Sequence, residues 1–252
     1  MANQDYPLTG LFLKGRLRHA MTPREADVLE RMICGSERFS RPHVIARRGD
    51  LIERSTMLVE GFVLRCINEG SRRHIVSLQV PGDFVDLHGF ALKRLDHDVV
   101  TIGPTKVAYV EHEALAKVVR DLPHLTRLLW FSTLLDAAIH REWIMSMERL
   151  AADGRLAHLL CETWRRLELV GLGDRHGFGL PLTQADLADT CGTTAVHMNR
   201  IIRKMRTQNI VDIRSGRISV PDRGVLERTG DFDPAYLYGP GSLAVGREMD
   251  QS

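Results

Sequence analysis

The chain has 252 residues, which is long enough to bury a substantial core in one large domain or in two smaller ones. Hydrophobic residues make up 44% of the sequence and charged residues 26%, as in soluble globular proteins, and no apolar run approaches the roughly 20 residues that span a bilayer. The formal net charge of +2 neither demands nor excludes a nucleic-acid partner.

Cysteine usage and the first residues give an expectation for the cellular compartment. The four cysteines lie far apart without a CxxC pair, which excludes a disulfide framework and a zinc ribbon. The opening MANQDYPLTG lacks the charged and then apolar pattern of a signal peptide. We therefore expect a cytoplasmic protein with no membrane partner.

The sequence from about residue 33 to residue 110 is typical of β-strands. Short apolar runs such as HVIARRGDLI and RRHIVSLQV are separated by turn sequences such as Arg48-Gly49-Asp50 and Pro81-Gly82-Asp83. Several short antiparallel strands at this spacing predict a small barrel, β-roll or jelly roll, which we assign to residues 21–121. A β-sandwich without any ligand is the alternative that this pattern leaves open.

A long helix is predicted next, over PHLTRLLWFSTLLDAAIHREWIMSMERL. Pro123 suits the first turn of a helix, and neither glycine nor a second proline follows before residue 154. Such a rod would be roughly 42 Å long at 1.5 Å per residue. A shorter amphipathic helix, RLAHLLCETWRRLELV, comes after it, and LGDRHGFGLP is expected to be a loop.

The apolar residues of the long helix form two stripes. The first has the heptad-like spacing of a seam between two helices and consists of Leu128, Phe131, Leu135, Ala138 and Met145. The second stripe consists of Trp130, Leu134, Ala137 and Ile144. We expect one stripe to pack on the chain's own β-roll and the heptad-like stripe to form a homodimer interface. A helix buried inside a monomer is the alternative.

The stretch LTQADLADTCGTTAVHMNRIIRKMR predicts two helices joined by a tight turn. Thr183 suits the N-cap of the first helix, and Asp186 stands where it can complete a capping box. Cys191-Gly192 supplies the turn, and Thr194 suits the N-cap of the second helix. The following IVDIRSGRISVPD predicts two strands joined by a turn. Together these elements are typical of a winged helix-turn-helix, which we place in residues 151–230.

The second of these helices has one apolar face and one polar, basic face. Met198, Ile201, Ile202 and Met205 are spaced to be buried together, and Val196, Asn199, Arg200 and Arg203 lie opposite them. Residues 195–217 contain six Lys or Arg residues but a single acid, Asp212. This local positive charge predicts DNA binding. A ligand-binding module that never contacts DNA would not need the two extra strands.

The order of these features resembles the Crp–Fnr superfamily of bacterial transcription regulators over nearly the whole chain. The resemblance rests on the VEG and PGDF turns, the long helix and, above all, LTQADLADTCGTTAVHMNRIIRKM. It implies an α+β fold with an effector-sensing β-roll (21–121), a dimerisation helix (122–150) and a winged helix-turn-helix (151–230). It also implies a homodimer on an inverted repeat of double-stranded DNA, with RNA polymerase as a further partner.

The resemblance implies which residues contact DNA. Arg200 aligns with an arginine that the family places on a guanine. The positions that carry Arg and Glu in the catabolite activator protein are Ala195 and Val196 here, so we expect a different half-site. The candidate DNA contacts are Thr183, Thr194, Ala195, Val196, His197, Asn199, Arg200, Arg203, Arg214 and Arg217.

The resemblance also implies where an effector would bind. Nucleotide-binding relatives hold the ribose with a Gly-Glu pair after GDF and the cyclic phosphate with an Arg-Ser/Thr pair ten residues later. Asp86-Leu87 and His97-Asp98 stand there in this chain, so we expect that cyclic AMP does not bind. The candidate pocket consists of Asp86, Leu87, His88, His97 and Asp98.

Other sensing chemistries have weaker support in the sequence. An iron–sulfur sensor of the Fnr type needs several N-terminal cysteines, and only Cys34 lies there. A haem- or metal-dependent sensor is the alternative, through His43, His74, His88 or His97, although histidines of a β-roll are more often structural. We predict no cofactor and no metal site. The chain has no GxxxxGK, HExxH or GxSxG motif, so we predict no catalytic residue and no enzyme.

Overall fold

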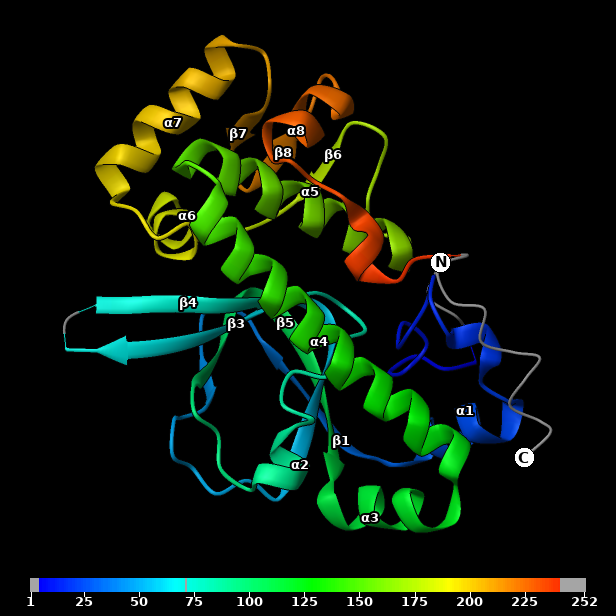
Figure 1. Ribbon diagram of the computed structural model, residues 1–252. Coiled ribbons are helices and arrows are strands. Elements are labelled where there is room, and N and C mark those ends of the chain that lie inside the picture. The colour runs from blue at the N-terminus through cyan, green and yellow to red at the C-terminus, as the bar shows by residue number, and fades with distance from the viewer. Residues whose placement is uncertain (1–4, 71, 241–252) are drawn as a thin grey trace.

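The computed structural model describes residues 5–70 and 72–240 and shows an α+β protein (Figure 1). The elements of the N-terminal part are η1 (Arg18–Ala20), α1 (Pro23–Arg31), β1 (Ile33–Phe39), β2 (Val44–Ala46), β3 (Arg54–Glu69), β4 (Arg72–Gln79), α2 (Gly89–Leu92), β5 (Asp98–Glu111) and α3 (His112–Asp121). Those that follow are α4 (Pro123–Arg149), α5 (Ala152–Val170), β6 (Gly177–Gly179), α6 (Gln184–Thr190), α7 (Ala195–Thr207), β7 (Asp212–Arg214), β8 (Arg217–Ser219), α8 (Arg223–Thr229) and η2 (Pro234–Leu237).

The main sheet is antiparallel, as the sequence predicts. Its strand order is β1-β5-β3-β4, and β2 pairs with another part of β5. The long strands β3 and β5 form its centre, with Val63 opposite Thr101, and the register shifts on either side of Glu60. Gly61 lies at this irregularity with a φ of +84°, and a Cβ there would come within 2.4 Å of the Pro104 carbonyl oxygen. Only glycine fits so close an approach of two strands.

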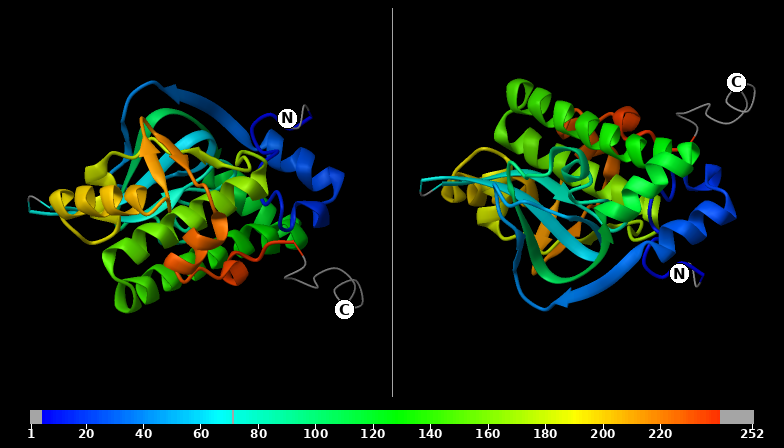
Figure 2. Two further views of the ribbon diagram at one scale, coloured as in Figure 1. Left: turned by 90° about the horizontal axis from the view of Figure 1, so that it is seen from above. Right: turned by 90° about the horizontal axis from the view of Figure 1, so that it is seen from below.

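The long helix α4 runs along one side of the main sheet, and the C-terminal helices lie over the sheet's end (Figures 1 and 2). Its 27 residues are unbroken, as predicted. Near its start, Leu125 and Leu128 pack in one apolar cluster with Phe12 of the N-terminal segment and Leu29 of α1. Further along, Ile139 packs on Leu237 of η2, which folds back onto the helix. The chain's own two ends thus cover one face of α4.

This packing bears on the predicted dimer seam. Leu128, Leu135 and Ala138 are only 3%, 6% and 6% exposed, because the same chain covers them. Side chains that are covered in this way offer little surface to a second protomer, and the homodimer interface stays a prediction. Of the same stripe, Phe131 is half-buried, with its ring 6.0 Å from that of Tyr238, and Met145 is exposed.

The stripe that remains uncovered is the second one. Trp130, Leu134 and Ile144 are 65%, 54% and 67% exposed, and Ala137 between them is half-exposed. Large apolar side chains in a row on one helix face are unusual in a monomer and mark an interaction surface. We call Trp130, Leu134, Ala137 and Ile144 the exposed stripe of α4.

The C-terminal part is a helix-turn-helix with a small three-stranded sheet, whose strand order is β6-β8-β7. The expectation of a loop over the whole of LGDRHGFGLP is wrong, because residues 177–179 form β6 and Phe178 pairs with Ile218 of β8. One apolar cluster joins side chains of the main sheet, such as Leu64 and Leu78, to side chains of α5, such as Leu160 and Trp164. The two parts of the chain therefore pack directly on each other.

Within the described part of the chain, no helix has both the length and the apolar character that crossing a membrane would need.

Candidate nucleic-acid interface

Local hydrogen bonds fix the two helices and the turn between them. Thr183 Oγ1 accepts a hydrogen bond from the Asp186 backbone N–H (3.1 Å), and Asp186 Oδ2 accepts one from the Thr183 N–H (2.8 Å). This is the predicted capping box of α6. Gly192 has a φ of +61° in the turn, and Thr194 Oγ1 accepts a hydrogen bond from the His197 N–H (3.2 Å) at the start of α7. The predicted caps and turn are confirmed.

Helix α7 has the two faces that the sequence predicts. Its apolar side chains, which are Met198, Ile201, Ile202 and Met205, are all buried against α5 and α6. On the outer side Arg200 and Arg203 are exposed, as are the three residues of the first turn, Ala195, Val196 and His197. The buried face anchors the helix, so the outer face is held in a fixed orientation towards solvent.

Asn199 lies at the edge of the outer face and is half-buried. Its side-chain Nδ2 donates a 2.8 Å hydrogen bond to Gln184 Oε1, which ties α7 to the first turn of α6. Asn199 is therefore already engaged, unlike the arginines beside it.

A two-stranded wing follows α7. Ile213 pairs with Ile218 and Arg214 with Arg217, and the two residues of the turn, Ser215 and Gly216, both have positive φ (48° and 76°). Two such residues match the tight hairpin turn that fits the twist of paired strands. The hairpin holds the exposed side chains of Arg214 and Arg217 close to its tip.

The basic side chains of this surface differ in whether carboxylates already pair with them. Arg214 Nε lies 2.8 Å from Asp212 Oδ2, and Arg217 is paired with Asp174. The hydrogen bond from Arg217 holds the pKa of Asp174 below its ordinary value, so this carboxylate is ionised at neutral pH. Arg200 and Arg203 form no ion pair with any residue of the described ranges 5–70 and 72–240. Their charges are available to a ligand without any exchange of partners.

An ion-pair cluster joins the helix-turn-helix to the main sheet. Arg73 of β4 lies 2.5 Å from Asp186 Oδ1 and 2.8 Å from Asp189 Oδ2, both on α6. Asp186 is the same residue that completes the capping box. This cluster could not be predicted from the sequence, because more than a hundred residues separate the partners and no local pattern connects them.

The five residues predicted to form an effector pocket have different surroundings. Asp86 is buried, its Oδ1 accepts a 2.5 Å hydrogen bond from the Thr56 N–H, and burial raises its pKa to about 6. Leu87 packs in the N-terminal apolar cluster. Asp98 accepts hydrogen bonds from the Arg48 N–H (2.7 Å) and from Asn68 Nδ2 (2.6 Å). Cavities of about 290, 360 and 570 Å³ lie elsewhere, and none of the five residues lines them. The shared effector pocket stays a prediction.

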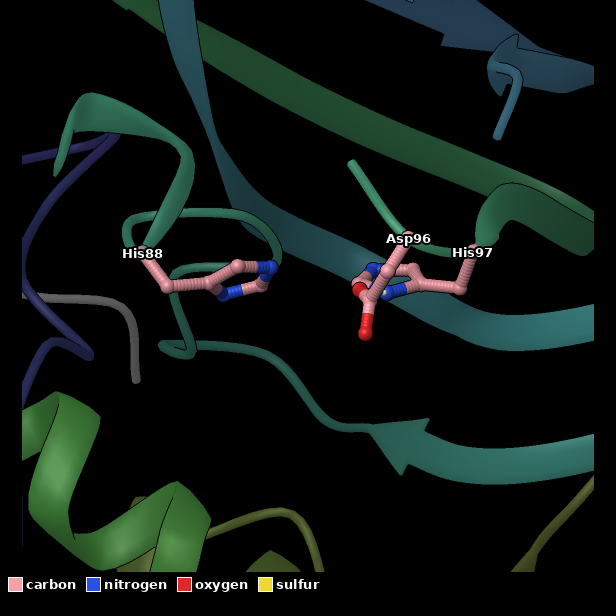
Figure 3. Close-up of side chains that lie close together, drawn as sticks. All are labelled: His88, Asp96 and His97. Atoms are coloured by element: carbon pink, nitrogen blue, oxygen red, sulfur yellow. Dashed lines mark hydrogen bonds and ion pairs between the residues drawn. The ribbon is translucent and has the colours of Figure 1, made fainter. Parts of the chain in front are cut away.

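His88 and His97 do lie together (Figure 3). Their ring centroids are 5.3 Å apart, and His97 Nδ1 is 2.7 Å from Asp96 Oδ1. Burial lowers the pKa of His88 to about 4 and also lowers the pKa of His97, so both imidazoles are neutral at neutral pH. The other candidate histidines lie apart from them: His43 stacks on Phe39, and His74 is exposed on β4.

Comparisons with known proteins agree with this geometry. Residues 154–229 match the family model described as a Crp-like helix-turn-helix domain. The chain is 29% identical to the transcriptional activator protein FnrL of Cereibacter sphaeroides over 191 residues. This match covers 73% of this chain and 75% of the relative. It is 24% identical over 190 residues to the nitrogen fixation regulation protein FixK of Bradyrhizobium diazoefficiens, covering 75% and 79%. The solved structure of FixK2 from Bradyrhizobium japonicum is similar in fold, with a TM-score of 0.70 at 22% identity, over 77% of this chain and 96% of that one.

Proposed function

The chain is a Crp/Fnr family transcription regulator with a Crp-like helix-turn-helix domain, and we propose that it binds an imperfect inverted repeat of double-stranded DNA as a homodimer. One observation carries the proposal: α7 is anchored by a buried apolar face and presents Arg200 and Arg203, unpaired within the described residues, on the opposite face. A helix held in this way fits the major groove, where arginine side chains can reach base edges and phosphates.

The outer face of α7 supplies the base contacts in this proposal. Arg200 has the planar fork that matches O6 and N7 of guanine. Val196 is exposed on the first turn and is suited to the methyl group of a thymine. Its neighbours Ala195 and His197 would lie against the same part of the groove. Asn199 would first have to give up its hydrogen bond to Gln184 before it could bind an adenine or a phosphate.

Other side chains bind the phosphate backbone and position α7 without specifying sequence. They are Thr183, Thr194, Arg203, Arg214 and Arg217. Arg214 and Arg217 are ion-paired with Asp212 and Asp174, so each must exchange a carboxylate for a phosphate on binding. We therefore expect Arg203 to contribute more to affinity than either arginine of the wing.

Dimerisation through the exposed stripe of α4 places two copies of α7 on one face of DNA. Its residues are four, three and seven positions apart along the helix, which fits the heptad repeat of a two-helix seam. Met145 is exposed next to the stripe and would add to the interface. In a two-fold dimer the recognition helices then reach half-sites about 34 Å apart, or one turn of DNA.

The remaining assignments follow from this arrangement. Residues 21–121 would sense a signal, residues 122–150 would form the dimer, and residues 151–230 would bind DNA. RNA polymerase would be a partner, which is supported by the naming of the relative FnrL as a transcriptional activator. A regulator of transcription in bacteria works in the cytoplasm, and we propose that location for this protein.

We predict that neither cyclic AMP nor cyclic GMP binds at physiological concentrations. Leu87 cannot accept a hydrogen bond from a ribose hydroxyl. Asp98 and Asp96 would place carboxylates beside the cyclic phosphate, and a like-charge contact costs several kcal/mol. Isothermal titration calorimetry with each nucleotide should show no heat of binding, and micromolar affinity for either would overturn this prediction.

The cysteines do not suit an iron–sulfur cluster, which needs several thiolates that converge on one point. Cys66 of β3, Cys161 of α5 and Cys191 after α6 are buried, and Cys34 is exposed on β1. Among the described residues, no group of three potential metal ligands includes a cysteine. Burial raises the pKa of the Cys66 thiol to about 11 and that of Cys191 to about 12, which favours the protonated form over the thiolate ligand.

DNA binding itself is tested by electrophoretic mobility shift with fragments of the genomic DNA. We expect a small set of fragments to shift in the presence of a large excess of unrelated DNA, and binding to weaken steeply as salt rises. A protein that shifts every fragment equally, or none, would contradict sequence-specific binding.

A further inference from the structure

Two imidazoles lie next to each other in the loop region between β4 and β5, and His97 is buried while His88 is half-buried. His88 directly precedes α2, and His97 directly precedes β5. Each has a buried Nε2 atom without a hydrogen-bond partner among the described residues. Nearly all buried polar atoms in native proteins are paired, and an exception points to a bound water or ion that the protein atoms alone do not show.

The geometry around the pair suits a metal ion. One donor atom from each of His88, Asp96 and His97 lies within 4.8 Å of the other two, and the side chains of His88 and Asp96 point towards His97 (Figure 3). Zinc–nitrogen bonds of about 2.0–2.1 Å place the ligands of a tetrahedral site roughly 3.3 Å apart. The imidazole donors of His88 and His97 would have to approach each other only by rotation of these two side chains, while Asp96 keeps its hydrogen bond to His97 Nδ1.

We propose that His88 and His97 bind a divalent transition-metal ion of the zinc class through their Nε2 atoms, with Asp96 as the carboxylate that orients His97. The bond between Asp96 Oδ1 and His97 Nδ1 fixes the tautomer, because it leaves the proton on Nδ1 and the lone pair on Nε2. Imidazole nitrogen is a preferred ligand of zinc and of its neighbours in the first transition series.

The charged groups around the pair are compatible with a cation. The positive charge of Arg65 disfavours a cation at this place. It is neutralised by Asp136 of α4, because Asp136 Oδ2 lies 2.6 Å from Arg65 Nη1. Asp96 adds a negative charge on the other side. No protein ligand beyond the two histidines is required, because water molecules or a small anion can complete the coordination. The cavities of about 290, 360 and 570 Å³ lie elsewhere, so a single ion suits this place better than a planar macrocycle does.

The test uses the full chain without an affinity tag, freed of metal by a chelator. Zinc chloride is added in competition with a chromophoric chelator, and we expect about one equivalent to bind. Asp96→Ala should weaken binding by about tenfold, as removal of an orienting partner does, and His88→Gln and His97→Gln should weaken it more. The matched controls His74→Gln and Cys34→Ser change exposed side chains elsewhere and should bind zinc as the wild type does.

A second measurement avoids any effect of the substitutions on folding. In wild-type protein labelled with ¹⁵N-histidine, zinc should shift the Nε2 resonances of two histidines and leave the exposed ones in place. Absence of zinc binding by the wild type, equal binding by His88→Gln, or shifts confined to exposed histidines would overturn the proposal and indicate a bridging water. The zinc titration does not test the proposed DNA contacts. Mobility shifts with metal-free protein test those contacts separately, so either proposal can fail alone.

Discussion

Leu134→Glu is expected to convert the dimer to a monomer at micromolar concentration and to weaken DNA binding with it. Leu134 lies in the middle of the exposed stripe of α4, between Trp130 and Ile144. In a two-fold interface each protomer would contribute one unpaired carboxylate, and a charge buried without a partner costs several kcal/mol. A penalty of only about 3 kcal/mol already raises the dimer dissociation constant more than a hundredfold. Sedimentation velocity measures this directly.

The control for this experiment is Val119→Glu on α3. Val119 is an apolar side chain of similar exposure, 48%, but it lies outside the stripe. Val119→Glu should leave the protein dimeric. Leu135→Glu tests the neighbouring stripe of α4: Leu135 packs on Leu237 within one chain, so this substitution should lower the melting temperature. A wild type that sediments as a monomer, or a Leu134→Glu variant that stays dimeric, would contradict the assignment of the interface.

Arg200→Ala should relax the preference for one base pair in each half-site and cost about 1–3 kcal/mol per protomer. The side chain is exposed on the outer face of α7 and would lose a bidentate contact with guanine. The remaining contacts, which are mainly to phosphates, should keep some binding to all sequences. Binding measured by fluorescence anisotropy against duplexes that carry single base changes resolves the effect.

Arg203→Ala is the matched control, because Arg203 lies one turn further along the same face and is likewise unpaired within the described residues. We expect it to weaken binding to all sequences alike and to reduce the slope of affinity against salt concentration by about one ion. If Arg200→Ala kept the full base preference of the wild type, the guanine contact would have to be assigned to another residue.

The helix-turn-helix could be predicted from sequence because its signals are local. Thr183 and Asp186 are three residues apart and complete a capping box by themselves, whatever the rest of the chain does. Gly192 accepts the positive φ of the turn, and the spacing of Met198, Ile202 and Met205 defines the buried face. Such features depend on neighbours within a few residues.

The choice between the two stripes of α4 could not be predicted in the same way. Both stripes have helical spacing, and heptad-like spacing alone favoured the one with Leu135. What decides is which residues from elsewhere cover each stripe. Leu237 reaches Leu135 from about a hundred residues away, and Phe12 reaches the start of the helix from the N-terminal segment. No pattern within residues 123–149 records these contacts.

The sensing region shows the same limit. The resemblance to the family predicts Asp86, Asp98, His88 and His97 in one pocket. In the structure His88 and His97 lie together, whereas Asp86 and Asp98 accept hydrogen bonds from different backbone N–H groups. The approach of the two histidines depends on how the loop around α2 folds over the sheet, which local spacing does not determine.

The most direct test of the account is selection of binding sites by the purified wild-type protein from a pool of random DNA duplexes. We predict enrichment of one inverted repeat whose half-site centres are about 10 base pairs apart, with a guanine at a fixed position in each half, and two protomers bound per duplex. Enrichment of a single unrepeated half-site, or no enrichment over the starting pool, would contradict it.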